Sequence, residues 1–387
     1  MTKKKKKRDF KYWIGKMHLW LGLASGIIVL FLSVTGCIFV FNEEISNWLR
    51  KDVLYVTEKA EKTLPVSQLW ETTQQQLGER IKDASIVVYN NPDKAWTFRS
   101  YKRKDKPDSI FHFGNIEYYQ TVYVNPYTGK VLGVYDETTD FFNIVKMLHW
   151  SLLLETEIGQ PIIGWGTFTF VIMLITGIIL WWPKNKAARK QRVWFQWKAT
   201  TQWKRKNYDL HNILGFYIAS IAIIIAFTGM VWAFTWFQAI VYVAGSGTTT
   251  PPDVKTEKSI VTKPGTISAL DTTLQICREK YPSASAYNYG KPAGATDVIN
   301  VYVQQVDGAY YINHNLQVDQ YTGKLLSQRD HSAKNFGEKL ITANYDIHVG
   351  AILGIPGKIL AFIACFICGM LPVTGFLIWY GRNFKKK

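Results

Sequence analysis

Four of the seven histidines stand at the edges of long apolar segments, where an imidazole could bind a metal inside a membrane. We call His18 and His211 the inner pair, and His149 and His348 the outer pair, for the membrane faces assigned below. A neutral imidazole is a good ligand for haem iron and is less unfavourable to bury than a charge. In a helix bundle, a b-type haem takes one imidazole on each side of the iron, from helices that face each other. The four histidines therefore predict axial ligands for two haem b groups.

A Thr-Gly dipeptide follows each of these histidines and brings a glycine to a defined depth. Thr35-Gly36 begins 17 residues after His18, and Thr228-Gly229 begins 17 residues after His211. A helix rises about 25 Å over that length, which carries these glycines to the level of the outer pair. Small residues let a flat macrocycle or a neighbouring helix approach the backbone. The glycines predicted to line the haem sites are Gly36 and Gly229 at the outer level, and Gly177 and Gly375 at the inner level.

Apolar segments long enough to span a bilayer must position these residues. About 20 apolar residues cover the hydrocarbon core as a helix. The chain has 387 residues, of which 48% are hydrophobic, and four runs reach that length. They are residues 19–41, 158–183, 210–244 and 359–381. The sequence therefore predicts a membrane protein with four transmembrane helices in contact with the lipid bilayer.

Positive charge is concentrated beside these spans and predicts their orientation. Residues 1–17, residues 184–209 and the tail after Tyr380 hold 21 of the 46 Lys and Arg residues, but 2 of the 29 Asp and Glu residues. Cytoplasmic segments near the ends of spans collect Lys and Arg. We therefore expect both termini and the middle loop in the cytoplasm. A nucleic-acid partner is the alternative for a basic chain, but it is not expected, because the basic runs all flank apolar spans.

The first apolar run could instead be a secretory signal peptide. Its apolar core of 23 residues exceeds the roughly 7–15 residues of a signal core, and no small-residue cleavage site follows Phe41. We therefore expect this run to remain as the first span.

Several features recur at nearly one interval, which indicates an internal duplication. The segment 127–130, Tyr-Thr-Gly-Lys, reappears at 321–324, a shift of 194 residues. The histidines of the inner pair are 193 residues apart and those of the outer pair 199. Repeats of this kind mark duplicated structural units. Each half consists of a span, a polar segment and a second span. Both halves start on the same side of the membrane, so we predict a parallel repeat.

The polar segments between the spans predict two extracytoplasmic α+β domains. Each is about 100 residues long, which suffices for a small domain. Helices are expected first, at Val66–Lys82 and Ile267–Lys280. The Tyr-Thr-Gly-Lys segments are typical of a strand, a turn at glycine and a second strand. Strands are predicted at Ser85–Tyr89, Ala95–Tyr101, Tyr119–Val124, Val298–Val303, Tyr310–Asn313 and Gln317–Val318.

The remaining histidines and the cysteines suggest no further site. His112, His314 and His331 lie in the polar segments without matched partners, and we predict that they are surface residues. Cys365 and Cys368 form a C-x-x-C pattern, but within a span we expect them to pack rather than to bind metal.

These patterns together predict the following domain organisation. It comprises a basic cytoplasmic N-terminus (1–17), a first span (18–42), a first periplasmic domain (43–146), a periplasmic-edge helix and second span (147–183), a basic cytoplasmic loop (184–209), a third span (210–244), a second periplasmic domain (245–346), a periplasmic-edge helix and fourth span (347–381) and a cytoplasmic tail (382–387).

The histidine and Thr-Gly segments resemble those of the PepSY-associated transmembrane helix family. Residues 16–22 (Lys-Met-His-Leu-Trp-Leu-Gly) resemble its first span. Residues 148–150 (Leu-His-Trp) with 176–183 (Thr-Gly-Ile-Ile-Leu-Trp-Trp-Pro) resemble its second, and residues 348–358 with 374–379 resemble its closing span. The polar segments with Tyr-Thr-Gly-Lys resemble PepSY domains. The resemblance covers nearly the whole chain.

The resemblance implies a function in iron uptake at the bacterial inner membrane. Members of the family are described as iron-regulated, and its FoxB-type members are siderophore reductases that carry two haems. A ferric siderophore would be reduced on the periplasmic side and release its iron, because Fe(II) is held more weakly. The chain has no G-x-G-x-x-G or other nucleotide motif, so the electron donor would be a separate partner. That donor would lie on the cytoplasmic side or in the membrane.

Two other functions compete with this one. The chain could be a non-enzymatic protein whose PepSY-like domains bind or restrain a peptidase outside the membrane. A transporter is less well supported, because no charged residue lies deep in a span.

Overall fold

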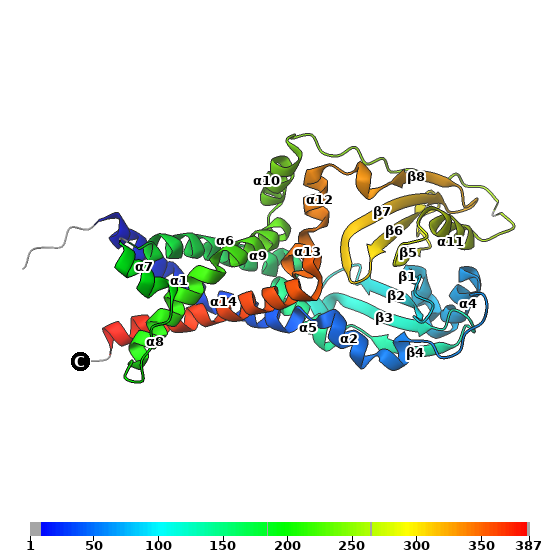
Figure 1. Ribbon diagram of the computed structural model, residues 1–387. Coiled ribbons are helices and arrows are strands. Elements are labelled where there is room, and N and C mark those ends of the chain that lie inside the picture. Colours follow the sequence, from blue (N-terminus) through cyan, green and yellow to red (C-terminus); the bar gives the residue numbers. More distant parts are fainter. Residues whose placement is uncertain (1–8, 184, 264, 385–387) are drawn as a thin grey trace, which may run out of the picture. The chain divides into compact units, whose positions relative to one another are not determined.

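The computed structural model describes residues 9–183, 185–263 and 265–384, and the chain forms two compact units (Figure 1). The first, which we call the helical unit, comprises Met1–Phe41, Val145–Gln238 and Ile347–Lys387. The second, which we call the sheet unit, comprises Asn42–Ile144 and Ala239–Asp346. The chain alternates between them, so each unit combines segments that are distant in sequence.

Among the described residues, four helices of the helical unit are long and apolar enough to cross a membrane, as predicted. The third starts as α8, passes through the π-helical turn η3 and continues as α9. Large apolar side chains such as Ile27 and Phe366 are exposed on these helices, as expected where lipid is the solvent. The bounds are α1 Phe10–Phe39, α6 Thr156–Trp181, α8 Trp203–Asp209, η3 Leu210–Leu214, α9 Gly215–Ala233 and α14 Gly354–Asn383.

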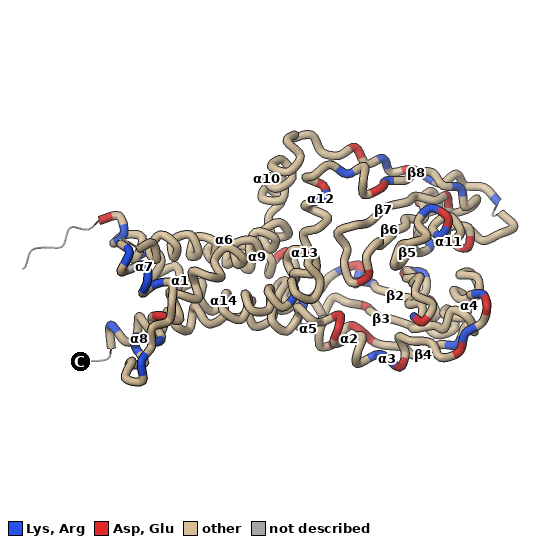
Figure 2. The backbone as a smooth tube through the Cα atoms, in the orientation of Figure 1, with Lys and Arg blue, Asp and Glu red and all other residues tan. Residues whose placement is uncertain are grey.

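Shorter helices flank the spans. α5 precedes α6, and α13 and η5 precede α14, whereas α7 lies between α6 and α8 and α10 follows α9. Figure 2 marks Lys and Arg residues in blue on α7, on α8 and at the starting end of α1. The predicted basic residues 3–8, 184 and 385–387 lie outside the described residues. The bounds are α5 Phe141–Ser151, α7 Lys186–Val193, α10 Thr235–Ser246, α13 Asn344–His348 and η5 Ala351–Leu353.

Within the described residues, the sheet unit is built on one antiparallel sheet of eight strands, in the order β4-β3-β2-β1-β5-β6-β7-β8. The first four strands come from the first polar segment and the last four from the second. They meet at the centre, where Val87 on β1 lies opposite Asn288 on β5. The two predicted domains therefore share a sheet. The strands are β1 Ala84–Tyr89, β2 Trp96–Arg103, β3 Ile116–Val124, β4 Val131–Asp136, β5 Ala286–Gly290, β6 Val298–Val306, β7 Ala309–Asp319 and β8 Leu325–Arg329.

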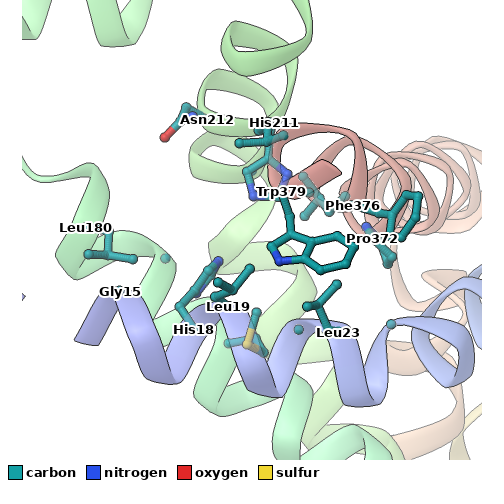
Figure 3. A pocket seen from close by; sticks show the side chains of 18 of the residues that line it. Gly15, His18, Leu19, Leu23, Leu180, His211, Asn212, Pro372, Phe376 and Trp379 are labelled. Carbon is teal, nitrogen blue, oxygen red and sulfur yellow. The ribbon is translucent and has the colours of Figure 1, made fainter. Parts of the chain in front are cut away.

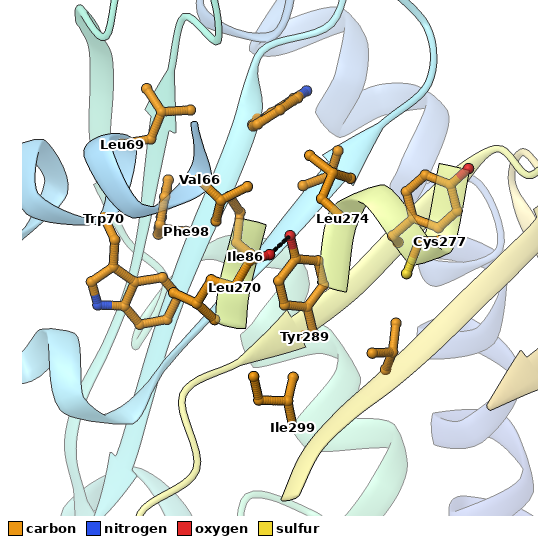
Figure 4. Close-up of a cluster of buried hydrophobic side chains, with 14 of the residues drawn as sticks. Val66, Leu69, Trp70, Ile86, Phe98, Leu270, Leu274, Cys277, Tyr289 and Ile299 are labelled. Atoms are coloured by element: carbon orange, nitrogen blue, oxygen red, sulfur yellow. Dashed lines mark hydrogen bonds between the residues drawn. The ribbon is translucent and has the colours of Figure 1, made fainter. Parts of the chain in front are cut away.

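Two helices, α4 and α11, bury the centre of this sheet (Figure 4). Trp70 on α4 packs edge-to-face against Phe98 on β2, with ring centroids 5.6 Å apart. Tyr289 on β5 donates a hydrogen bond from its hydroxyl to the Leu270 carbonyl on α11, at 3.2 Å. One core thus belongs to both halves of the chain. The helices of the sheet unit are α2 Asn42–Leu49, α3 Lys51–Leu54, α4 Val66–Leu77, η1 Gly78–Asp83, η2 His112–Asn115, α11 Ala269–Lys280, η4 His331–Ala333 and α12 Phe336–Thr342.

The predicted elements of the polar segments are found with three differences. The helix expected at Val66–Lys82 ends at Leu77 and continues as a 3-10 turn. The strands expected at Tyr310–Asn313 and Gln317–Val318 are parts of the single strand β7. Strands β4 and β8 are the second strands expected after the two Tyr-Thr-Gly-Lys turns. No strand is predicted at β5, which is short and includes Asn288 and Gly290, residues with low strand propensity. Both Tyr-Thr-Gly-Lys turns are confirmed, with φ of 74° at Gly129 and 70° at Gly323.

The predicted surface position of the other histidines is wrong for His112. This side chain is buried, and its ring packs against Phe113 with centroids 5.5 Å apart. His314 is largely buried as well, and its Nδ1 lies 2.9 Å from a carboxylate oxygen of Asp330. Burial was missed because a lone histidine in a polar stretch carries no periodicity that assigns it to a face.

Candidate cofactor sites

The inner pair of histidines faces one cavity in the helical unit (Figure 3). His18 lies on α1 and His211 lies in the π-helical turn η3. Their ring centroids are 6.4 Å apart and their planes are inclined by 88°. The cavity has a volume of about 570 Å³, within the range of roughly 300–1,000 Å³ that is usual for small-molecule sites.

The outer pair has nearly the same geometry. His149 on α5 and His348 at the end of α13 have ring centroids 6.0 Å apart and planes inclined by 71°. Both residues lie outside the four spanning helices. Burial, with a smaller contribution from the neighbouring imidazole, lowers the pKa of His149 to about 3, and burial lowers the pKa of His348 to about 4. Both imidazoles are therefore neutral at physiological pH, which is the form that binds a metal.

Each of the four imidazoles is held by a threonine from another helix. The threonine hydroxyl also lies near a carbonyl one turn back in its own helix, as in the bond of 2.8 Å from Thr176 to Ile172. Since the hydroxyl has one hydrogen, which it donates to the carbonyl, its oxygen accepts the proton on Nδ1 of the histidine. Nε2 then keeps its lone pair for a metal. The Nδ1–Oγ1 distances are 2.9 Å for His18–Thr176, 2.9 Å for His211–Thr374, 2.9 Å for His149–Thr35 and 2.8 Å for His348–Thr228.

The predicted glycines contact the edges of the same imidazoles. A Cβ atom on Gly375 would lie 3.2 Å from Cε1 of His211, so a methyl group there would press on the ring. The structure thus places all four glycines at the levels that the sequence predicts, but against imidazoles. In each Thr-Gly dipeptide the threonine holds a ring nitrogen and the glycine leaves room for the ring. The other distances are 3.4 Å for Gly177 to His18, 3.5 Å for Gly36 to His149 and 3.7 Å for Gly229 to His348.

The walls of the inner cavity suit a flat, largely apolar cofactor with charged groups at one edge. Leu19, Leu23 and Phe376 contribute apolar surface, and Trp379 lies beside His18 and His211 in Figure 3. Carboxylates such as the haem propionates require hydrogen-bond donors or a cation. Polar side chains that line the cavity and could serve them are Tyr208, Asn212, Arg382 and Asn383.

The separation of the imidazoles within each pair fits a single metal between them. An imidazole nitrogen binds a metal at about 2.0–2.1 Å, so two rings on opposite sides of one metal have centroids roughly 6 Å apart. The observed separations of 6.4 Å and 6.0 Å agree with this arrangement. The residues present therefore fit haem iron with two axial histidines at each site.

Local backbone features position the histidines. His211 lies in a π-helical turn, a distortion that is frequent at functional sites. After α5, Leu152 and Leu153 adopt left-handed conformations, with φ of 58° and 63°, and Gly350 with φ of 81° makes the turn after α13. Such strain in leucine persists only where surrounding packing enforces it. Each turn packs on a glycine of the following span: a Cβ on Gly159 would lie 1.9 Å from the Ser151 carbonyl oxygen, and one on Gly357 would lie 2.0 Å from that of Gly350.

The threonines are the site residues that sequence reasoning missed. The Thr-Gly dipeptides predict the positions of the glycines, and the threonines have no predicted role. A signal was present, since a threonine precedes the glycine at all four positions. A hydroxyl at a repeated position inside an apolar span predicts a buried hydrogen bond, because an unpaired polar group is unfavourable there.

The four long apolar helices are those of a multi-pass membrane protein, and the chain segments that alternate with them form an α+β sheet unit. The chain belongs to the family described as PepSY-associated TM region, which it matches over residues 16–382. This match confirms the resemblance drawn from the histidine and Thr-Gly segments. No curated protein matches the chain.

Proposed function

We propose that the chain is a di-haem b reductase of the bacterial inner membrane that passes electrons to a ferric siderophore in the periplasm. The observation that carries this proposal is the pair of matched imidazole sites, with ring centroids 6.4 Å and 6.0 Å apart. Both are built from helices of the unit that carries the membrane spans. The same arrangement gives no advantage to a protein that only packs helices, because it buries four polar rings in apolar surroundings.

The residues of each site have distinct tasks. Haem bound between the imidazoles supplies a one-electron carrier. His18 and His211 would hold the inner iron through Nε2, and His149 and His348 the outer iron. The threonines fix the ring orientation and tautomer, and the surrounding apolar helices exclude water, which are the levers by which a protein sets a redox potential.

The placement of the two sites supports transfer across the membrane. His18 lies near the start of α1, whereas Thr35, which holds His149, lies near its end. The 17 residues between them correspond to about 25 Å of helix. We propose that electrons enter at the inner site from a donor in the cytoplasm or the membrane and leave at the outer site.

The siderophore, the orientation and the duplication belong to the proposal as well. The positive-inside pattern supports cytoplasmic termini and periplasmic PepSY-like domains. The mirrored strand order of the sheet and the repeated Thr-Gly dipeptides support an origin by tandem duplication. The ferric siderophore is proposed from the family alone, as a large chelate that accepts an electron outside the membrane.

The test of the two sites is the haem content of the purified protein. We expect a haem-to-protein ratio near two and the visible spectrum of low-spin haem with two imidazole ligands. His18→Ala or His211→Ala should remove mainly one haem, and His149→Ala or His348→Ala the other. A ratio that stays near two in these variants would contradict the ligand assignment. A colourless protein from haem-replete cells would favour the alternative, a non-enzymatic protein that binds or restrains an extracytoplasmic peptidase.

The test of the acceptor uses vesicles of known orientation in which the haems are chemically reduced. Adding a ferric siderophore outside should reoxidise the haems and release Fe(II), which a chelator traps. His149→Ala should keep the inner haem and lose this reaction. Reoxidation at the same rate in that variant would rule out the outer site as the exit.

The test of the orientation uses reporter fusions. Fusions after Asp136 and Lys324 should be exported, and a fusion after Lys198 should remain in the cytoplasm. The reversed pattern would refute the proposed topology.

A further inference from the structure

Two cysteines from different spans lie close together beside the outer site. Cys37 lies on α1 directly after Gly36, and a Cβ atom on Gly36 would lie 3.2 Å from the sulfur of Cys365 on α14. The Cys37 sulfur also lies 3.6 Å from the Phe362 carbonyl oxygen, one turn before Cys365. Both cysteines are half-buried, whereas Cys277 and Cys368 are buried. The close approach therefore involves the two more accessible thiols of the chain.

The packing of α1 on α14 makes this close approach possible. Gly36 precedes Cys37, and a Cβ atom there would lie 3.2 Å from the Cys365 sulfur and 3.9 Å from its Cβ. Glycine thus lets the two backbones approach to a separation at which side chains meet directly. Phe41 and Phe362 pack nearby with ring centroids 6.1 Å apart and hold the same helices together. The sequence pattern C-x-x-C points to Cys368 as the partner of Cys365, but the structure pairs Cys365 with Cys37.

We propose that Cys37 and Cys365 are a redox modification site, which a hydroperoxide oxidises to a disulfide that joins α1 to α14. One thiol gives up its proton and its sulfur attacks hydrogen peroxide, so that an S–O bond forms and the O–O bond breaks. The leaving oxygen takes up that proton and departs as water. The second thiol then attacks that sulfur, the S–S bond forms, the S–O bond breaks and a second water leaves. Two thiols are oxidised, and hydrogen peroxide is reduced to two waters.

The site sits where such a disulfide can form and persist. Cys37 is two residues from the end of α1, at the level of the outer histidines. With the orientation proposed above, this end faces the oxidising side of the membrane, where disulfides are stable. A small neutral peroxide can reach the half-buried thiol of Cys37, near the end of α1, more readily than a thiol in the packed interior.

The disulfide would act on the outer site through Gly36 and its neighbours, a consequence that rests on the proposed function. Gly36 separates the Cys365 sulfur from the His149 ring, because its Cβ would contact both, at 3.2 Å and 3.5 Å. Thr35, which holds Nδ1 of His149, is two residues from Cys37. A bond that changes the distance between α1 and α14 would therefore shift Thr35, the hydrogen-bond partner of His149.

The first test identifies the bond by mass spectrometry. Purified full-length protein is reduced, treated with hydrogen peroxide, blocked with N-ethylmaleimide and digested without reductant. We expect two of the four thiols to be lost and a peptide containing Cys37 linked to one containing Cys365. Cys37→Ser and Cys365→Ser should abolish the link, and the matched control Cys368→Ser should keep it. A predominant Cys365–Cys368 link, sulfinic acids without a link, or four intact thiols would each overturn the proposal.

A second test separates this inference from the proposed function. The visible spectrum of the oxidised and reduced forms should differ in wild type and in Cys368→Ser, but not in Cys37→Ser. The link should still form in His149→Ala, because its chemistry does not need the outer haem. A colourless protein that forms the link would refute the proposed function and leave the thiol site standing. A haem-loaded protein that forms no link would refute the thiol site and leave the proposed function standing.

Discussion

Among the single residues, the hydrogen bond between each of the four paired histidines and a threonine carries the most information. A histidine that binds iron through Nε2 needs an acceptor for its Nδ1 proton, and a buried N–H without one loses roughly 1–3 kcal/mol. Thr176 provides this acceptor for His18 at 2.9 Å. The other three threonines do the same at their sites, so the tautomer is set at all four positions.

Replacing one of these hydroxyls tests that role. In Thr176→Val the shape of the side chain is kept and the acceptor for His18 is lost. We expect the affinity of the inner site for haem to fall roughly 10–100-fold, the usual effect of removing a partner of a metal ligand. Haem titration of the apoprotein measures this, and Thr176→Ser should retain wild-type affinity. Equal affinities in all three proteins would show that the hydrogen bond does not support the ligand.

A second residue-scale prediction concerns Asp330 in the sheet unit. Burial raises the pKa of its carboxyl, but hydrogen bonds from Tyr281, His314 and Gln328 outweigh this and lower it below the usual value. A carboxyl whose pKa is lower in the folded than in the unfolded protein stabilises the fold at pH values above its unfolded-state pKa, near 3.8. This stabilisation is lost as the pH falls through the folded-state pKa. The melting temperature of the sheet unit should therefore decrease when the pH is lowered below about 4.

Asp330→Asn provides the matched comparison. The amide keeps the shape but cannot titrate, so the loss of melting temperature between pH 6 and pH 3 should be smaller than in wild type. Circular dichroism of the full-length protein at several pH values measures both curves. Parallel curves would mean that Asp330 does not contribute to the pH dependence.

At the scale of elements, the turns that lead into α6 and α14 determine where the outer histidines stand. The turn after α13 packs so closely on α14 that a Cβ atom on Gly357 would lie 2.0 Å from the Gly350 carbonyl oxygen. Backbone at that distance has to move, because no flexible side chain can yield. The short helix that ends at His348 would move with it.

Gly357→Ala should therefore damage the outer site and spare the inner one. Overpacking of this kind typically destabilises by about 1–3 kcal/mol. We expect the haem-to-protein ratio to fall from near two toward one, with the remaining signal sensitive to His18→Ala. Gly381→Ala on the same helix, where a Cβ meets nothing within 4 Å, is the control. Two haems retained in Gly357→Ala would contradict the proposed role of the turn.

At the scale of the whole molecule, the two polar segments depend on each other because they share a sheet. Strand β1 pairs with β2 of its own segment and with β5 of the other. Ile86 on β1 is fully buried in the core that both segments fill. A smaller side chain at position 86 should therefore reduce the stability of both segments together.

Ile86→Ala tests this dependence. A buried isoleucine replaced by alanine usually costs about 2–5 kcal/mol. Hydrogen exchange of the full-length protein should show lost protection in β2 and β6 to a similar extent. Val134→Ala on β4, where the side chain is half exposed, should have little effect in either strand. Loss confined to β2 would mean that the segments unfold separately.

Features that arise from local pattern could be predicted from the amino-acid sequence. The four spans follow from runs of apolar residues. A helix in lipid makes all its backbone hydrogen bonds within itself, so each span can be identified from its own sequence. The levels of the histidines and glycines follow from the fixed rise of a helix, which converts 17 residues into a depth. The turns at Gly129 and Gly323 follow from the need for a positive φ.

Which of these features contact one another depends on the packing of the folded chain. His18 binds a threonine 158 residues away and His149 one 114 residues away, and no periodicity in the chain specifies such partners. The pairing of β1 with β5 and the hydrogen bond from the Cys37 thiol to the Phe362 carbonyl likewise join the two halves of the chain. Local pattern fixes the depth and the face of a residue, but contacts between segments depend on how whole helices and strands pack, because packing is cooperative over the entire core.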